Sequence, residues 1–239
     1  MLSMPPQQIA ELCNFASVAD KEARSDLSLG YISGEDDYTS NFTGALRRII
    51  NSNSSTGLSA TSFVLQPRIE QRTGCDATIL ISSNGHIKIA MFEAKLPRFG
   101  TSMYRWDYAQ TASGLSHFSD QLTRQARFWP RFAIFEMFYC ELPFGQQAAH
   151  LQSEGSSCTW HDETAQFDSS RSASRSPWTQ GELDSLLQIR NTGVGDVLAS
   201  ICQCDHGTPM SMWGDAEAVA QEFSLEGPVL HIAAATSRR

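Results

Sequence analysis

One aspartate, one glutamate and one lysine in this sequence combine side chains that could catalyse hydrolysis at a phosphate. Asp76 begins an apolar run, and Glu93 and Lys95 end the apolar run that follows it. Two carboxylates that lie close together repel each other, and a cation such as Mg²⁺, which prefers oxygen ligands, relieves that repulsion. A lysine ammonium beside the metal can stabilise developing negative charge or help to deprotonate a water. The three residue types therefore suit metal-assisted phosphodiester hydrolysis, if the fold brings them together.

A β-hairpin is the element that would bring these three side chains together. Asn84-Gly85 separates the two apolar runs, and this dipeptide between β-rich segments predicts a two-residue turn. Pairing outward from that turn places Asp76 opposite Glu93, with Cβ atoms roughly 5 Å apart. Lys95 follows two residues later and points to the same face. A slip of one residue or a longer loop would separate them, and the alternative interpretation is an ion pair on a solvated hairpin face.

The length and composition predict one sizeable α/β domain with a packed core. The chain has 239 residues, of which 41% are hydrophobic, and a net charge of −8. Such acidity argues against nucleic acid as a partner. The charge is uneven, however, because residues 61 to 131 contain nine lysine and arginine residues against five acidic residues, a net charge of +4. A local basic face on an acidic protein is consistent with this distribution.

The same composition leads us to expect a cytoplasmic protein with no membrane partner. No apolar run approaches the roughly 18 residues of a membrane span, and the N-terminus lacks the pattern of a signal peptide. The six cysteines are scattered, which predicts reduced thiols rather than a disulfide framework. Cys202, Cys204 and His206 could hold a metal, but no second ligand pair lies at zinc-ribbon spacing.

Shifts in composition predict four segments along the chain. Residues 1–33 form an N-terminal helix and loop, and residues 34–144 form the core that contains the hairpin. Residues 145–178 are rich in Ser, Gln, Gly and Glu, which predicts a loop-rich excursion. Residues 179–239 form a C-terminal extension of helix and strand that packs on the core.

The expected secondary structure alternates helices and strands, which predicts an α/β fold with a central mixed β-sheet flanked by helices. The expected helices cover residues 6–22, a segment after the cap Ser33 with acids in its first turn, 108–129 and 180–189. Besides the hairpin, the expected strands cover residues 62–70, 131–142 and 227–235. Pro67 would place the first of these at an edge or bulge, and residues 193–204 suit either state.

This order of elements resembles the PD-(D/E)xK nuclease superfamily, which has the restriction-endonuclease-like fold. The matching residues are Asp76 at the head of one strand and Glu93-Ala94-Lys95 at the end of the next. "TGCD" is similar to the "TGxD" entry of several bacterial branches, and a glutamine-bearing helix and an apolar strand follow the lysine. The resemblance covers residues 34–142. Cys75 stands where the name-giving proline would be, and the last hundred residues match nothing in the family.

The resemblance implies a Mg²⁺- or Mn²⁺-dependent nuclease that acts on DNA. Asp76 and Glu93 would be metal ligands, with the Ala94 backbone carbonyl as a further ligand. Lys95 would orient or activate the attacking water and stabilise the transition state. Gln121 would hold the metal-bound water or a phosphate, although a solvent-facing glutamine is the alternative.

The first turn of the helix that precedes the strands would supply another acid. Glu35 would act as a ligand of a second metal or through water, and Asp36 and Asp37 compete for that role. The alternative is ordinary complementation of the helix dipole.

Basic and aromatic residues near this core are candidates for nucleic-acid contacts. Arg98, Arg124 and Arg127 could contact phosphates, or could form a solvated basic face. Three aromatic residues could stack on bases or pack in the core: Tyr104, Trp106 and Tyr108. His117 lies in the same region without an assigned role.

The leading hypothesis is a DNA endonuclease, in a bacterial or phage restriction or defence context by family analogy. The alternatives are a non-catalytic nucleic-acid- or protein-binding subunit that retains the fold, an RNA-directed nuclease, and a small α/β interaction domain. Many nucleases of this fold act as dimers, so a homodimer or a protein partner is expected from the resemblance alone. The chain contains no recognisable helix-turn-helix or zinc finger, so specificity would come from residues 145–239 or from a partner.

Overall fold

The structure is a computed structural model of the chain. It describes residues 2, 4–64, 73–97, 106–143, 145–146, 150–173, 175–225 and 227–235.

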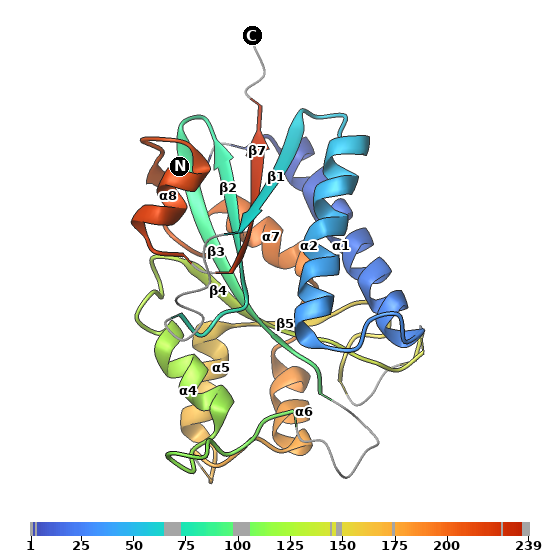
Figure 1. Cartoon of the computed structure of the whole chain (residues 1–239), viewed down its shortest axis with the longest axis vertical. Helices are drawn as coiled ribbons and strands as arrows, with labels where there is room; N and C mark the ends of the chain where they lie inside the picture. Colours follow the sequence, from blue (N-terminus) through green and yellow to red (C-terminus); the bar gives the residue numbers. More distant parts are fainter. Residues whose placement is uncertain are drawn as a thin grey trace.

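The described residues form an α/β fold in which seven helices flank a mixed seven-stranded sheet (Figure 1). The strand order is β1-β7-β2-β3-β4-β5, and the short β6 pairs with β3. The β7–β2 and β3–β4 pairs are parallel and the others are antiparallel. The strands are β1 (Leu58–Val64), β2 (Ala77–Ser83), β3 (His86–Lys95), β4 (Ala133–Phe138), β5 (Ser157–Trp160), β6 (Met210–Ser211) and β7 (Pro228–Ala234). The helices are α1 (Pro6–Ser28), α2 (Glu35–Asn53), α4 (His117–Gln125), α5 (His161–Ser170), α6 (Gln180–Ile189), α7 (Val194–Gln203) and α8 (Ala216–Glu222). The predicted fold class is confirmed.

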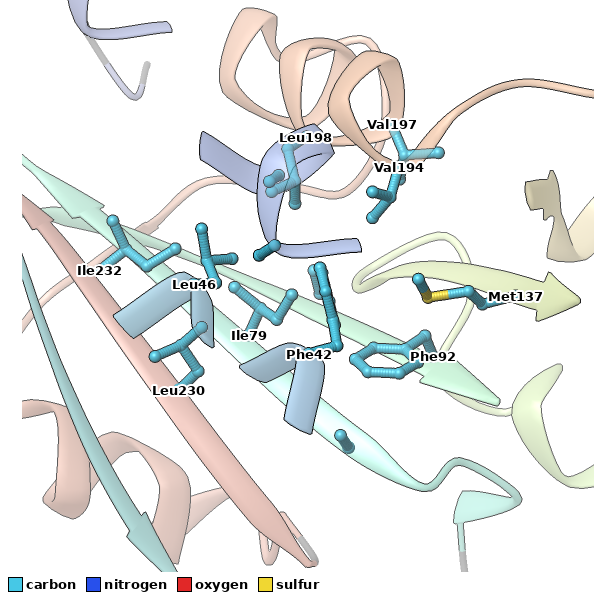
Figure 2. Packing of buried hydrophobic residues seen from close by; sticks show 14 of the residues in the cluster. Phe42, Leu46, Ile79, Phe92, Met137, Val194, Val197, Leu198, Leu230 and Ile232 are labelled. Atoms are coloured by element: carbon cyan, nitrogen blue, oxygen red, sulfur yellow. The ribbon is translucent and has the colours of Figure 1, made fainter. Parts of the chain in front are cut away.

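Helices cover both faces of the sheet, which explains why β2 and β3 are almost continuously buried. On one face, α1, α2 and α7 pack against the alternate residues of the strands. Figure 2 shows Phe42 and Leu46 of α2 beside Ile79 and Phe92 of the hairpin. The other face packs against α8 through a second apolar cluster, to which Met91 contributes. Because side chains alternate along a strand, Glu93 and Lys95 share the face of Met91.

The hairpin has the predicted register. Ser83 pairs with His86, and regular pairing continues to Ala77 opposite Phe92. Asn84 and Gly85 both have positive φ angles, 51° and 72°, as a type I′ turn requires. The local Asn-Gly signal therefore decides which residues stand opposite each other.

The C-terminal strand β7 lies inside the sheet, between β1 and β2. The last strand was expected at residues 227–235, in an extension packed on the core. The C-terminal strand therefore pairs with two strands from the first half of the chain and is part of the sheet itself (Figure 1).

The helix predicted over residues 108–129 is wrong in length, because α4 covers only His117–Gln125. Gly114 has a φ of 69°, which a continuous helix cannot accommodate. Ser116 caps the helix by accepting a hydrogen bond from the Ser119 amide at 2.9 Å. The cap and the preceding turn override the helical composition of residues 108–115.

Residues 145–178, expected to be loop-rich, include the strand β5 and the helix α5. Buried charges on α1 hold the segment that leads to them. The Arg24 guanidinium, fully buried, donates to the carbonyls of Leu142, Gln146 and Gln152 at 3.4, 2.8 and 2.7 Å. These long-range contacts stabilise an ordered path that the loop-like composition did not predict.

Other element limits differ modestly from expectation. α1 extends to Ser28 rather than residue 22, and the N-cap of α2 is Gly34 rather than Ser33. Residues 194–203, which suited either state, form the helix α7. The helix expected at 180–189 has these bounds in the structure. Pro67 lies outside the described residues.

Candidate active site

Asp76 lies beside the Glu93-Ala94-Lys95 segment, at the open end of the hairpin. Its amide donates to the Phe92 carbonyl at 2.8 Å. Its Oδ2 atom accepts a hydrogen bond from the Ala94 amide, also at 2.8 Å. The structure therefore brings the two predicted carboxylates to one end of the sheet.

Gly74 shapes the turn that positions Asp76. Its φ is 73°, and a Cβ atom at this position would lie 2.7 Å from the Gln121 carbonyl oxygen on α4. The Gln125 side-chain amide donates to the Gly74 carbonyl at 2.7 Å. Only glycine combines this backbone angle with such a close approach, so the turn before Asp76 lies directly against α4.

Glu93 and Lys95 form a buried ion pair. Glu93 is 1% exposed and Lys95 is 5% exposed, which contradicts the alternative of a solvated surface ion pair. The Glu93 Oε1 atom accepts hydrogen bonds from Lys95 Nζ and from the side-chain amide of Gln121. The Oε2 atom of Glu93 is buried and has no hydrogen-bond partner among the described residues. Such an oxygen is costly to bury unless a cation or a water completes the site.

Burial and charge together perturb the titration of these groups. Burial raises the pKa of Asp76 to about 6, although Lys95 and the Ala94 amide oppose the shift. Burial, followed by repulsion from Asp76, raises the pKa of Glu93, against the attraction of Lys95. Burial also works against a charged Lys95, but Glu93, Glu35 and Asp76 outweigh it and raise the pKa of the lysine. Asp76, Glu93 and Glu35 thus surround a single lysine, and repulsion between Asp76 and Glu93 opposes ionisation of both.

A cavity of about 390 Å³ opens between α2 and α4, with Asp76 and Glu93 in its wall. This volume is within the range of small-ligand sites. From α4, His117, Gln121 and Arg124 line it at intervals of four and three residues, on one face of the helix. The other lining residues are Asp36, Thr39, Ser40, Gly74, Cys75, Gly227 and Pro228.

Two of the three acids in the first turn of α2 face this region. Glu35 accepts a hydrogen bond from the Leu96 amide at 2.8 Å and lies 3.9 Å from Lys95 Nζ. Asp36 lines the cavity. Asp37 is exposed and is not among the residues that line it.

The predicted phosphate-contacting arginines have different outcomes. Arg124 lines the cavity and pairs with Asp120, with 3.1 Å between Nε and Oδ2. Arg127 is exposed and lies outside the cavity lining. Arg98 lies outside the described residues. The face of α4 that carries Gln121 is therefore the better-supported binding wall.

A second group of buried polar residues behind the cavity was missed from the sequence. Glu136 on β4 stands in register with Glu93 on β3, and it is buried. The side-chain nitrogen of Gln125 donates to Glu136 Oε2 at 3.4 Å. The side-chain oxygen of Gln125 accepts a hydrogen bond from His161 Nδ1 at 2.8 Å. A lone glutamate in the apolar strand "AIFEMF" was the available signal, because unpaired acids are rarely buried.

The donor set fits a hard cation with few protein ligands. Asp76 and Glu93 supply carboxylates, and the Ala94 carbonyl faces the Asp76 side because it shares a strand edge with the Ala94 amide. Mg²⁺ commonly binds through one or two carboxylates and keeps several waters. Among the described residues, His, Cys, Asp and Glu nowhere form a cluster of three or more suited to a metal. The buried, unpartnered oxygen of Glu93 is the observation that favours a cation here.

In the described part of the chain, no helix is long and apolar enough to cross a membrane. Comparison of the chain with protein-family models, with curated proteins and with solved structures finds no match.

Proposed function

We propose that this protein is a divalent-metal-dependent nuclease that hydrolyses phosphodiester bonds of DNA. The observation that carries the proposal is the convergence of Asp76 and Glu93 at one cavity, with Lys95 bonded to Glu93 inside the fold. Buried acids with raised pKa values in a cleft are typical of functional sites. The resemblance to the PD-(D/E)xK superfamily supplies the reaction class.

Asp76, Glu93 and the Ala94 carbonyl would hold Mg²⁺ or Mn²⁺. When bound, the metal would stabilise charge on the phosphate oxygens and lower the pKa of a coordinated water. The protein prepares the ligands by keeping the half-buried Asp76 carboxylate beside the buried Glu93 carboxylate, where their repulsion favours binding of a cation. The backbone amide of Ala94 donates to one carboxylate oxygen of Asp76, and the side-chain amide of Gln121 donates to one of Glu93. These hydrogen bonds fix one oxygen of each carboxylate.

Lys95 would stabilise the transition state as a cation rather than serve as a general base. Its pKa is raised by Glu93, Glu35 and Asp76, so it holds its proton at neutral pH. A fixed ammonium group in a site shielded from water stabilises negative charge strongly. Glu35 restrains the lysine from the α2 side.

Gln121 would position the nucleophile or a phosphate. Its amide nitrogen donates to Glu93, and its Oε1 atom has no hydrogen-bond partner among the described residues. That oxygen can accept a hydrogen bond from a water bound near Glu93. Arg124, one helical turn further on, would contact an adjacent phosphate.

A plasmid cleavage assay tests the proposal. Supercoiled DNA is incubated with the wild type, Lys95→Ala or Lys21→Ala, in Mg²⁺, in Mn²⁺ and in EDTA. Lys21 is the matched control, because it forms an exposed ion pair with Glu154. We expect metal-dependent nicking or linearisation that only Lys95→Ala abolishes.

Three outcomes would count against this function. DNA binding that is unaffected by Mg²⁺ and by Lys95→Ala, without cleavage, would indicate a non-catalytic binding subunit. Cleavage of RNA but not of DNA in parallel reactions would reassign the substrate. Absence of both cleavage and calorimetric metal binding would remove the catalytic claim.

A further inference from the structure

Two stacked aromatic rings lie at the rim of the proposed active site. The rings of Tyr108 and His117 have centroids 4.7 Å apart and planes inclined by 13°. His117 lines the same cavity as Asp76 and Glu93. Tyr108 is 55% exposed, so the stack joins the cavity to the open surface.

The backbone around this stack is held in place. The His117 amide donates to the Tyr108 carbonyl at 2.9 Å. The buried Asp107 carboxylate accepts hydrogen bonds from the amides of Tyr108 and Phe118 at 2.9 and 3.0 Å and from the Ser116 hydroxyl at 2.6 Å. A surface ring on such a rigid support loses little conformational freedom when a ligand packs on it.

Neighbouring aromatic residues show that this exposure is not general. Trp106, only two residues earlier, is buried among Phe118, Phe138 and Trp178. Of the two alternatives for these aromatic residues, core packing therefore holds for Trp106, whereas Tyr108 is exposed. Tyr104 lies outside the described residues.

We infer that Tyr108, backed by His117, is a stacking surface for an unpaired nucleobase beside the scissile phosphate, so that the substrate is DNA with a single-stranded segment. The inference rests on the proposed function. Bases within a duplex are stacked on each other, whereas an unpaired base offers its face to an aromatic side chain. Burial, then Lys95 and Arg124, lower the pKa of His117, so the backing ring is neutral at neutral pH.

The arrangement also accounts for the position of Arg124. His117 and Arg124 lie on one face of α4, on either side of Gln121. A strand whose base stacks at Tyr108 would place its phosphates along this face. The aromatic surface and the arginine would then bind a flexible strand by the combination typical of single-strand sites.

The test measures binding of fluorescent oligonucleotides of about 12 nucleotides. The substrates are a single strand, the same strand with abasic sites, the blunt duplex, and an RNA of the same sequence. Binding is measured for two backgrounds, the wild type in EDTA and Lys95→Ala in Mg²⁺. Each background is compared with the same protein carrying Tyr108→Leu or Tyr108→Phe. Leucine removes the aromatic face and phenylalanine keeps it, and the exposure of Tyr108 makes both changes tolerable to the fold.

We expect Tyr108→Leu to weaken single-strand binding about 5- to 150-fold, with little effect on the duplex. Tyr108→Phe and the wild type should prefer the single strand to the duplex, and abasic sites should reduce their affinity as Tyr108→Leu does. Equal loss on both substrates, no loss, a preference for the duplex, or no oligonucleotide binding would overturn the inference. Tighter binding of the RNA than of the DNA single strand would overturn the assignment of DNA as the substrate.

Parallel cleavage reactions in Mg²⁺ separate this inference from the proposed function. If the protein cleaves DNA and Tyr108→Leu leaves its preference for single-stranded over duplex DNA unchanged, the stacking surface alone would be overturned. Binding that depends on the aromatic ring, in a chain that cuts no nucleic acid, would overturn the hydrolase alone.

Discussion

Glu93 on β3 stands directly beside Glu136 on β4, and both side chains are buried. Two glutamines one helical turn apart on α4 approach them, Gln121 at Glu93 and Gln125 at Glu136. Each glutamate has one oxygen without a hydrogen-bond partner among the described residues. Only Glu93 lines the cavity, so the two acids are chemically alike but differ in access to a ligand.

This difference gives a paired prediction for metal binding. Glu93→Gln should abolish stabilisation by Mg²⁺, whereas Glu136→Gln should retain it. For the wild type, a free metal concentration 100 times Kd adds about 2.7 kcal/mol, a rise of several degrees in Tm. Thermal unfolding with and without Mg²⁺ measures the effect. Equal responses of the two variants would contradict the assignment of Glu93 as the ligand.

Asp76 should make the metal-free protein less stable as the pH rises. Its folded pKa of about 6 exceeds the ordinary value of 3.8, so the folded state holds the proton more tightly. The associated stability is present below pH 4 and is lost as the pH rises through 6, by about 3 kcal/mol.

The variant Asp76→Asn should lack that loss of stability and should be more stable than the wild type at pH 7.5 without metal. Denaturant unfolding from pH 4 to 7.5 measures the difference. Asp37→Asn, at an exposed position outside the cavity lining, is the matched control. A constant difference between wild type and Asp76→Asn across this pH range would refute the prediction.

Lys95→Met should destabilise the protein by about 3 kcal/mol at neutral pH, because it leaves the buried Glu93 carboxylate without its cation. The loss should shrink at low pH, where Glu93 becomes neutral by taking up a proton. The double variant Glu93→Gln/Lys95→Met should recover stability. Urea unfolding of the three variants measures this coupling, and additive losses would argue against it.

Gly74→Ala should cost more stability than Gly114→Ala, although both residues have a φ near 70°. Each change incurs about 1 kcal/mol or more of backbone strain. At Gly74 the added Cβ would also lie 2.7 Å from the Gln121 carbonyl oxygen, whereas no described atom lies within 4 Å of that position at Gly114. We expect Gly74→Ala to cost about 1–3 kcal/mol more than its control, and equal changes in Tm would contradict the packing of this turn on α4.

Arg24→Met should loosen residues 142–156, because it removes the donors that bind their carbonyls. The buried Asp20, which accepts hydrogen bonds from the Ser156 amide and hydroxyl, would also lose a neighbouring cation. We expect a loss of about 3–5 kcal/mol and faster cleavage by a non-specific protease within this segment. Lys21→Met, at an exposed ion pair, should change neither property. Unchanged proteolysis of Arg24→Met would contradict this role.

Features controlled by neighbouring residues were predictable. Asn84-Gly85 specified the hairpin, because both residues adopt the positive φ angles of the turn. Thr179 and Glu182 form a capping box, and the predicted helix at 180–189 begins there. Counting from the turn also predicted that Asp76 lies close to Glu93, although regular pairing ends at Ala77 opposite Phe92 and the Asp76 amide donates to the Phe92 carbonyl.

Features controlled by distant residues were not predictable in the same way. The helix expected over residues 108–129 begins only at His117, after Ser116, whose amide donates to the distant Arg175 carbonyl at 2.7 Å. Residues 157–170 form a strand and a helix, and α1 holds the chain leading to them through Arg24 and Asp20. Local propensity contributes tenths of a kcal/mol per residue, which such buried contacts exceed.

By itself, the sequence determined the hairpin, its register and the three charged residues at its end, because turn angles and strand alternation act within a few residues. Only the tertiary structure decided that β7 lies beside β2 and that Glu136 lies beside Glu93. It also decided that Tyr108 stacks on His117 at the rim of the cavity. Strand order and burial arise from contacts between residues far apart in the chain, and no local pattern encodes which of those contacts form.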